Sequence, residues 1–432
     1  MNPERLRQAM RSLPYWWEAA PRPQTAPGEL PDKADVVIVG SGFTGLSAAL
    51  TLCRAGRDVV VLERESPGWG ASSRNQGHVA SAFKRGISEL IDAYGKTRAV
   101  RLFKEGQAAV EFCKTLIEKE GIDCHLEKRG RLLLAWTPAH YEALAKEIRQ
   151  RVALCSLEAD VITRDEARAQ VASAQYHGGV LMHREATLHG ALYHLGLLKI
   201  ATEAGAAIVS GTEVRRIEGA TASFKVETSR GPLSARNVLI ATNAYTDCVD
   251  RALSRRIVPV NSFGIATDIL DADQIDEVLP GRRAGVDTLK LSHGFRVAPG
   301  ENRIIFGTRP PYRETNPERG AARLHAQMLR VFPQLEGVQI THAWTGNVGF
   351  PFDFLPHLGC RGGVHYAMGY GGTGVALATY LGHKIALRIL GDVAGESVFS
   401  ELAFQSRPFY TGHPWFLGAV LRYYGWLDKQ AK

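Results

Sequence analysis

The chain is poor in cysteine, and its cysteines are not paired in the sequence. Their spacing matches neither a zinc site, nor a redox-active Cys-x-x-Cys pair, nor a disulfide framework. We therefore expect reduced thiols, no metal site and a reaction that does not use a cysteine pair. The six residues are Cys53, Cys113, Cys124, Cys155, Cys248 and Cys360.

Long apolar runs are also absent. The longest, such as Val36–Val39 and Val59–Leu62, have the length of a strand, whereas a membrane-spanning helix requires ~20 apolar residues. The N-terminal segment carries charges and lacks the apolar stretch and cleavage site of a secretory signal. With 45% hydrophobic and 22% charged residues, the composition is that of an ordinary folded protein, which we expect in the cytoplasm.

Runs of charge of one sign are missing as well. The 52 basic and 44 acidic residues leave a net charge of +8, but the densest basic groups are isolated pairs such as Arg215-Arg216 and Arg282-Arg283. Such an excess is typical of a solvated surface, so we do not expect nucleic-acid binding.

A glycine-rich turn is the most informative feature that is present. Asp35–Val39 predicts a buried parallel strand, and Gly40, Gly42 and Gly45 follow it as G-x-G-x-x-G. These glycines allow a tight turn, the close approach of a pyrophosphate, and close packing of a helix predicted from Phe43 to Arg54. The free amides at the start of that helix would bind phosphate.

An acidic residue completes the dinucleotide motif. Glu63 follows a second predicted strand, Asp58–Leu62, at the position where a carboxylate accepts hydrogen bonds from ribose hydroxyls. Its charge disfavours the 2′-phosphate of NADP. The residues predicted to bind the dinucleotide are Gly40, Ser41, Gly42, Phe43, Thr44, Gly45, Glu63 and Arg64.

The next segment favours FAD over NAD. The run GWGASSRNQGHVA places small and polar residues directly after Glu63, where they can lie flat against a cofactor; a flexible surface loop is the alternative. The residues predicted to contact FAD are Gly70, Ala71, Ser72, Ser73, Asn75, Gln76 and Gly77.

A second G-x-G-x-x-G follows the predicted strand Val364–Met368 and precedes a helix predicted from Val375 to Leu390. Asp392 comes directly after that helix with no strand before it, so a second dinucleotide site is not expected. We instead predict a helix N-terminus that faces the flavin, and a substrate that supplies the hydride itself. The residues concerned are Gly369, Gly371, Gly372, Thr373 and Gly374.

Several motifs together resemble one family. They are VGSGFTGLSAA, LERE, GASSRNQGHV, NVLIATNAYT, WTGNVGFPFDFLPHLG and MGYGGTGVALATYLG. This combination resembles the D-amino-acid oxidase and glycine oxidase superfamily of FAD-dependent enzymes over about Asp32 to Leu390. Within it, SRNQGHV is most similar to the loop of γ-glutamylputrescine oxidase-like flavoproteins.

The resemblance implies an α/β fold with α+β insertions, in which a Rossmann-like FAD-binding domain carries an inserted mixed-sheet substrate domain. It implies further FAD contacts at Val214, Thr242, Asn243 and Gly346, and we expect the FAD to be bound non-covalently. We expect FAD-binding segments at 1–90 (with an N-terminal arm), 151–255 and 343–395, substrate-domain insertions at 91–150 and 256–342, and a C-terminal tail at 396–432.

The expected reaction oxidises a C–N bond of an amine or amino acid by hydride transfer to flavin N5, followed by imine hydrolysis. His78 closes the loop predicted to run beneath the flavin, and an ordinary histidine titrates near neutrality. Covalent flavin attachment through His78 or Cys360 is a weaker alternative, because neither residue matches the attachment motifs of relatives.

Arginine would recognise a substrate carboxylate, because its planar fork binds two oxygens. Arg296 and Arg309 lie in the predicted inserted sheet with His293 nearby. Sarcosine oxidase-like relatives place a lysine after the late glycine turn, where this chain has Val375 and Ala376. Trp344 and Phe350 are candidates for an apolar wall.

Oxygen or another acceptor would reoxidise the flavin. One alternative is a dehydrogenase that passes electrons to a quinone or protein partner, with peripheral membrane contact through the aromatic segment Phe409–Trp426. Another, motivated by the pI of about 9.2, is a flavin domain that acts on modified RNA.

Overall fold

The first sheet is built around the apolar strand that precedes the first glycine turn. In the computed structural model, which describes residues 10–23, 28–220, 222–310 and 316–431, β1 (Lys33–Val39) pairs in parallel with β2 (Val59–Leu62) and β11 (Gly231–Ile240). β8 (Ala207–Val209) and β18 (Val364–Met368) extend the sheet in parallel, and β17 (His357–Arg361) forms an antiparallel edge. The strand order is β17-β18-β11-β1-β2-β8.

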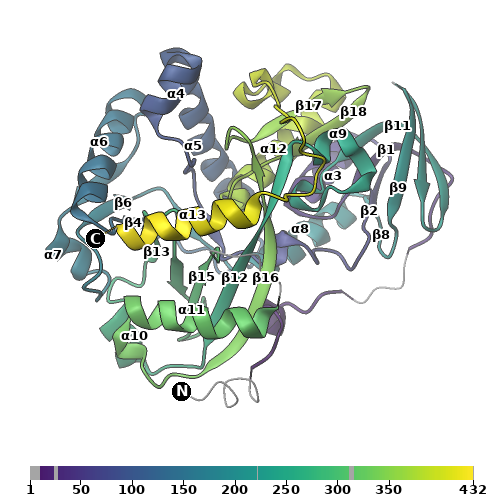
Figure 1. Ribbon diagram of the computed structural model, residues 1–432. Helices are drawn as coiled ribbons and strands as arrows, with labels where there is room; N and C mark the ends of the chain where they lie inside the picture. The colour runs from purple at the N-terminus through teal and green to yellow at the C-terminus, as the bar shows by residue number, and fades with distance from the viewer. Residues whose placement is uncertain (1–9, 24–27, 221, 311–315, 432) are drawn as a thin grey trace.

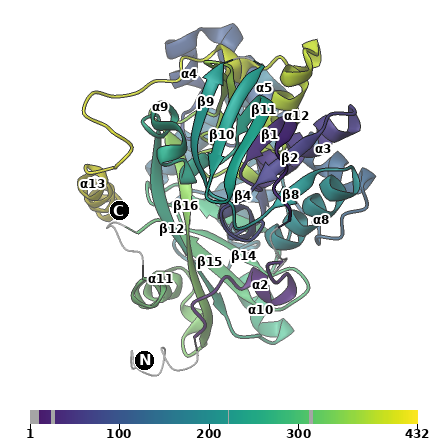
Figure 2. The same ribbon diagram turned by 90° about the vertical axis from the view of Figure 1, so that its right-hand side faces the viewer.

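Both faces of this sheet are covered, which explains why β1 is apolar throughout. Val36 and Ile38 face a layer of helices, while Val37 and Val39 face a curled antiparallel extension of the sheet. The helices are α3 (Phe43–Arg54), α5 (Lys96–Lys119), α8 (Gly190–Glu203) and α12 (Gly374–Leu390), and the extension is β9 (Val214–Ala220) and β10 (Ser223–Thr228). Figure 2 shows this sheet above a second one.

The second sheet has eight strands in the order β16-β12-β15-β14-β13-β4-β6-β5. All neighbours are antiparallel except β13 and β4. The strands are β4 (Arg131–Leu134), β5 (Ala159–Ile162), β6 (Gly179–Met182), β12 (Ile257–Thr267), β13 (Ala284–Asp287), β14 (Gly294–Val297), β15 (Ile304–Thr308) and β16 (Ile340–Pro351).

Successive residues along these strands point alternately to the two faces of the second sheet. Ile265, Phe295 and Phe306 pack against α10 (Ala272–Val278) and α11 (Pro317–Val331). Their neighbours on the opposite face include Gly264, Gly294 and Gly307, which line the cavity described below. Because successive residues of a strand point to opposite sides, one face of this sheet forms a core and the other is left for a ligand.

The structure corrects three of the predicted segment boundaries. β5 and β6 fall in 151–255 but pair in the second sheet, and β16 carries that sheet to Pro351. α5 falls in 91–150, yet Leu102 and Phe103 pack in the helical core of the first sheet. Local periodicity predicts that a strand or helix forms, but long-range pairing decides which sheet it joins.

The remaining elements connect and cover the two sheets. They are α2 (Trp16–Ala19), α4 (Ile87–Tyr94), α6 (Pro138–Cys155), α7 (Arg164–Arg168), α9 (Arg251–Ser254), α13 (Leu417–Gln430) and the short pair β3 (His78–Val79) and β7 (Ala186–Thr187). Among the helices in the described ranges, none is long and apolar enough to span a membrane.

The C-terminal helix α13, drawn in yellow in Figure 1, closes one side of the second sheet. Leu417 and Leu421 pack against Val258 and Phe350. Near the end of the helix, Asp428 accepts hydrogen bonds from the backbone N–H groups of Lys290 at 2.8 Å and Leu291 at 2.9 Å. The tail therefore fixes the turn between β13 and β14.

Candidate active site

A single continuous cavity joins the two glycine turns to the glycine-bearing face of the second sheet. Gly40, Gly42 and Glu63 line it at the edge of the first sheet, and Gly371 and Gly372 line it at the second turn. Its other end reaches β4, β13, β14 and β15. Elements far apart in sequence thus share one ligand-sized space.

The first glycine turn has the backbone that phosphate binding requires. Gly40 has a positive φ of 101°, and a Cβ at Gly45 would overlap the carbonyl oxygen of Gly40. No side chain caps α3 at Gly42. Ser72 Oγ accepts from the Phe43 N–H at 3.0 Å, which leaves the following amides of the helix start for an anion.

Glu63 is oriented by its neighbours. Its Oε2 atom accepts from the Ser41 N–H at 3.0 Å and from Ser41 Oγ at 2.6 Å, and its Oε1 atom accepts from the Glu65 N–H at 3.1 Å. Ser41 itself is buried and does not line the cavity. The predicted role of Ser41 is therefore indirect, through the carboxylate that it holds.

We predict that Glu63→Gln weakens FAD binding about 10- to 100-fold, because a neutral amide accepts weaker hydrogen bonds from ribose hydroxyls than a carboxylate does. Fluorescence titration of the apoprotein with FAD measures this change. Glu203→Gln, whose side chain forms only a surface pair with Lys199 and does not line the cavity, is the matched control and should bind FAD as the wild type does. Equal loss in both variants would contradict a ribose contact.

The second glycine turn is tied to the first. Tyr370 Oη lies 2.6 Å from Thr44 Oγ1, and Asn243 Oδ1 accepts from the Gly369 N–H at 2.9 Å. Gly371 and Gly372 have positive φ values of 59° and 106°. Because α12 also lacks a side-chain cap, two helix N-termini meet at the cavity, one suited to a pyrophosphate and the other to a partly anionic ring.

The loop after Glu63 is fixed by its own side chains. Asn75 Nδ2 donates to the carbonyls of Ala71 and Ser72 at 3.1 and 2.8 Å, and Asn75 Oδ1 accepts from the Gly77 N–H at 2.8 Å. Ser73 Oγ donates to the Gly68 carbonyl at 2.6 Å. These bonds describe an ordered segment rather than the flexible surface loop that the sequence left open.

Gln76 connects this loop to the second sheet. Its Nε2 atom donates to the Gly294 carbonyl at 3.1 Å. A Cβ at Gly294 or at Gly307 would overlap the Gln76 amide. Glycine at both positions is therefore what allows the loop to lie directly on β14 and β15.

Most of the predicted FAD-contact residues line the cavity. These are Gly40, Gly42, Phe43, Thr44, Glu63, Arg64, Gly70, Ala71, Ser72, Asn75, Gln76, Val214, Thr242, Asn243, Gly346, Gly371, Gly372, Thr373 and Gly374. Five do not: Ser41, Gly45, Ser73, Gly77 and Gly369. These five residues fix the backbone of the turns without facing the cavity, because their hydrogen bonds or missing Cβ atoms set the path of the chain.

His78 lines the cavity, but it does not titrate near neutrality as the sequence suggested. Both ring nitrogens are buried without a hydrogen-bond partner among the described residues. Burial, and then the nearby charges of Arg131 and Arg296, lower the pKa of His78 well below its ordinary value. His78 is therefore a neutral imidazole at pH 7.

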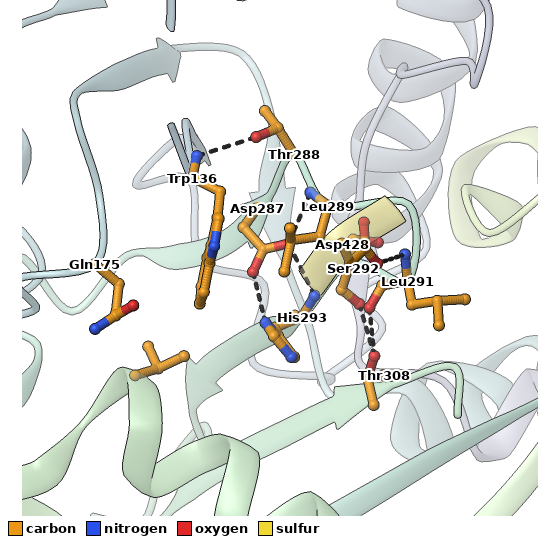
Figure 3. A network of polar contacts seen from close by, with 12 residues as sticks. Trp136, Gln175, Asp287, Thr288, Leu289, Leu291, Ser292, His293, Thr308 and Asp428 are labelled. Carbon is orange, nitrogen blue, oxygen red and sulfur yellow. Dashed lines mark hydrogen bonds and ion pairs between the residues drawn. The ribbon is translucent and has the colours of Figure 1, made fainter. Parts of the chain in front are cut away.

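The structure places two predicted catalytic residues away from the cavity. Arg296 is 1% exposed and donates to the carbonyls of Gln76, Leu188 and Val297. His293 Nδ1 lies 2.7 Å from Asp287 Oδ2 (Figure 3), and His293 does not line the cavity. Neither side chain is available to a substrate, and of the two predicted arginines only Arg309 lines the cavity.

Sequence reasoning missed several residues that line the cavity. Arg74 stacks over Trp69, with its guanidinium carbon 4.5 Å from the ring centroid, and Tyr245 Oη accepts from the Asn347 N–H at 3.1 Å. Lys84 was also missed. The same segment also contributes His78, Ala80, Ala82 and Phe83 to the cavity, so no strict alternation marks Lys84 in the sequence.

Of the remaining candidates from the sequence, some line the cavity and others do not. Trp344 lines the cavity and donates from Nε1 to the Arg74 carbonyl at 2.9 Å, whereas Phe350 packs beside α13. Cys360 is exposed on β17 and does not line the cavity, so it is not placed for flavin attachment. Val375 lines the cavity where relatives carry lysine, so that end of the site has no cation of this kind.

The positive-φ turn at Gly40, the uncapped helix starts and the preorganised Glu63 fit an FAD group. The first turn would hold the pyrophosphate, Glu63 the ribose, and the loop Gly70–His78 together with the second turn the flavin.

Comparisons with known proteins agree with this fit. The pattern of the FAD dependent oxidoreductase family matches residues 35–388. Similar proteins include the probable oxidoreductase OrdL of Haemophilus influenzae, 32% identical with 87% of each chain covered. The gamma-glutamylputrescine oxidoreductase of Escherichia coli is 30% identical, with 85% of this chain and 86% of that protein covered.

A crystal structure of glycine oxidase from Geobacillus kaustophilus has a similar fold. Its TM-score is 0.71 at 20% identity, with 88% of this chain and 99% of that chain covered. This similarity confirms the predicted fold, in which a Rossmann-like domain carries a mixed-sheet insertion. With a family match that extends over most of its length, this chain belongs to the FAD-dependent oxidoreductase family, and FAD is its cofactor.

Proposed function

We propose that this protein oxidises a C–N bond of an amine or amino acid and that the resulting imine is hydrolysed by water. The observation that carries the proposal is the single cavity, which continues past the dinucleotide turn to the glycine-bearing face of the second sheet. Bound FAD supplies the two-electron oxidant there by accepting hydride at N5. The gamma-glutamylputrescine oxidoreductase relative supports an amine substrate.

The protein residues provide position and charge. Lys84, Arg131 and Arg309 line the substrate end of the cavity, and their positive charge repels a bound ammonium group. We therefore expect the reacting amine at the flavin-facing part of the cavity, in the neutral form that can lose hydride from its carbon. His78, being uncharged, offers a proton acceptor or donor at the wall without adding another cation.

Anaerobic mixing of the FAD-loaded protein with a panel of amines and amino acids tests this proposal. We expect at least one compound of the panel to bleach the visible flavin absorbance in proportion to its concentration and to yield ammonia and an oxo product. A panel in which alcohols and hydroxy acids bleach the flavin while no amine does would contradict C–N oxidation.

A second candidate concerns the electron acceptor. Phe409, Trp415, Tyr423 and Trp426 are 87%, 67%, 56% and 55% exposed, and the last two rings stack at 6.1 Å. Exposed aromatic clusters of this kind favour contact with a partner or a membrane surface, and hence delivery of electrons to a quinone rather than to oxygen. Reoxidation of the bleached enzyme by a water-soluble quinone but not by air would select this route.

A further inference from the structure

Three cations gather at the end of the cavity that the second sheet forms. Lys84, Arg131 and Arg309 all line it. Arg309 Nη2 donates to Ser292 Oγ at 2.9 Å, and the guanidinium carbon lies 5.4 Å from the Phe350 ring centroid. Lys84 is exposed to the open space of the cavity but is surrounded by protein on its other sides, and it has no hydrogen bond or ion pair with any described residue.

Asp287 and Asp428 offset part of the positive charge of Lys84 and Arg309, but among the described residues neither acid forms an ion pair with them, because both are hydrogen-bonded elsewhere. Asp287 accepts from the Leu289 and His293 N–H groups at 3.2 and 3.0 Å and pairs with the His293 ring (Figure 3). Asp428 accepts from two backbone amides. An anion that entered the cavity would find free N–H groups on both cations.

Arg131 adds a buried charge behind them. It is 4% exposed and its Nε atom donates to Glu185 Oε2 at 2.5 Å, but its Nη2 atom has no partner among the described residues. A buried, unsatisfied guanidinium nitrogen is costly unless the site receives an anion. This is a second observation that points to an anionic ligand.

The cation cluster is displaced from the loop that faces the flavin. Gln76 of that loop lies on Gly307 of β15, and Arg309 follows two residues later on the same face, a step of about 7 Å in an extended chain. Ala80 and Ala82, which lie between His78 and Lys84 in the sequence, also line the cavity, and their side chains are small. A ligand that touches both ends must be elongated.

We propose that Lys84 and Arg309 bind a carboxylate at the far end of an elongated substrate, several bonds from the carbon that is oxidised. The inference rests on the proposed function and narrows its substrate class to amines that carry a remote carboxylate. Arginine supplies the planar fork and lysine a mobile point charge.

The protonation of Lys84 gives the subsite a pH dependence. The charge of Arg309, then burial, and the charges of Arg131 and Lys290 lower the pKa of Lys84 to about 7, while Asp287 opposes them. Below that pH Lys84 is a cation ready to bind; above it the free amine must take up a proton with the ligand. Affinity for the carboxylate therefore falls as the pH rises above about 7.

Calorimetric titration of the FAD-loaded protein with glutarate tests the subsite without catalysis. Lys84→Met should weaken glutarate binding about 10- to 100-fold. Lys84→Arg should bind glutarate about as tightly as the wild type does, and its affinity should not fall between neutral and alkaline pH, because arginine stays charged. Lys290→Met removes a nearby cation that does not line the cavity, and it should bind glutarate as the wild type does. Equal affinity in Lys84→Met, or binding of inorganic phosphate but not of glutarate, would overturn the proposal.

A substrate pair separates this inference from the proposed function. In anaerobic bleaching, 5-aminopentanoate should saturate at a concentration about 10-fold or more below that of pentylamine, and Lys84→Met should remove the difference. Equal saturation of the two compounds would overturn the subsite while leaving amine oxidation intact. If no amine bleaches the flavin but glutarate binding still depends on Lys84, the proposed function fails and the anion site stands.

Discussion

Replacing Glu185 with alanine is expected to lower the free energy of unfolding by about 3–5 kcal/mol. The carboxylate lies 2.5 Å from Arg131 Nε and accepts from the Ser81 N–H at 3.0 Å and from Ser81 Oγ at 3.2 Å. The side chains of Arg131 and Glu185 are only 5% and 3% exposed. Without Glu185, the charge of Arg131 would stay buried and unpaired, beside two further cations.

Urea unfolding at saturating FAD measures this loss. Glu158→Ala is the matched control, because Arg184 Nη2 lies 2.6 Å from Glu158 Oε1 but both side chains are more than half exposed, at 56% and 54%. Surface pairs of this kind contribute about 0–1 kcal/mol. Similar losses in the two variants would show that burial does not set the strength of the Arg131–Glu185 pair.

The sequence predicted the first sheet well because its signals are local. The helix Phe43–Arg54 and the strand Val364–Met368 were predicted with the observed bounds. In both cases a glycine turn and an apolar run of defined length lie next to each other in the chain. Gly56, which follows the end of this helix, has a φ of 76°, the left-handed backbone with which glycine often ends a helix.

The second sheet and the substrate end of the site depend on contacts that no local pattern contains. Arg296 and Arg309 looked equivalent in the sequence, since each lies on or next to a strand of the same sheet. The carbonyls of Gln76 and Leu188, distant in sequence, accept from Arg296 and remove it from the site. Arg309, by contrast, lies beyond the point where the loop covers the sheet.

Lys84 was missed for a related reason. It follows the predicted FAD loop in a segment without helical or strand periodicity of its own. The direction of this segment is fixed by the short pairing of β3 with β7 and by the hydrogen bonds of Ser81 to Glu185. The partners that lower its pKa come from three other parts of the chain: Arg131, Lys290 and Arg309. Electrostatic clusters of this kind are properties of the folded chain.

Gly45→Ala is expected to abolish FAD binding while the second sheet stays folded. A Cβ at this position would overlap the Gly40 carbonyl oxygen and lie 3.2 Å from Ile38 Cγ2. The turn cannot yield easily, because the Gly40 N–H donates to the Leu62 carbonyl at 2.9 Å and the φ of Gly40 is 101°. Relief of the overlap must therefore move α3 away from β1, and with it the amides that face the pyrophosphate.

The ratio of flavin to protein absorbance after purification, read with far-ultraviolet circular dichroism, measures this effect. Gly418→Ala is the control, because nothing lies within 4 Å of its added Cβ. Gly418 is in the first turn of α13, so alanine should raise the free energy of unfolding by no more than about 0.5–1 kcal/mol and leave the FAD content unchanged. Full FAD content in Gly45→Ala would mean that α3 can shift without losing its phosphate contacts. In that case the second turn, which is joined to α3 through Thr44 and Tyr370, must move with it, because both helix starts border one cofactor cavity.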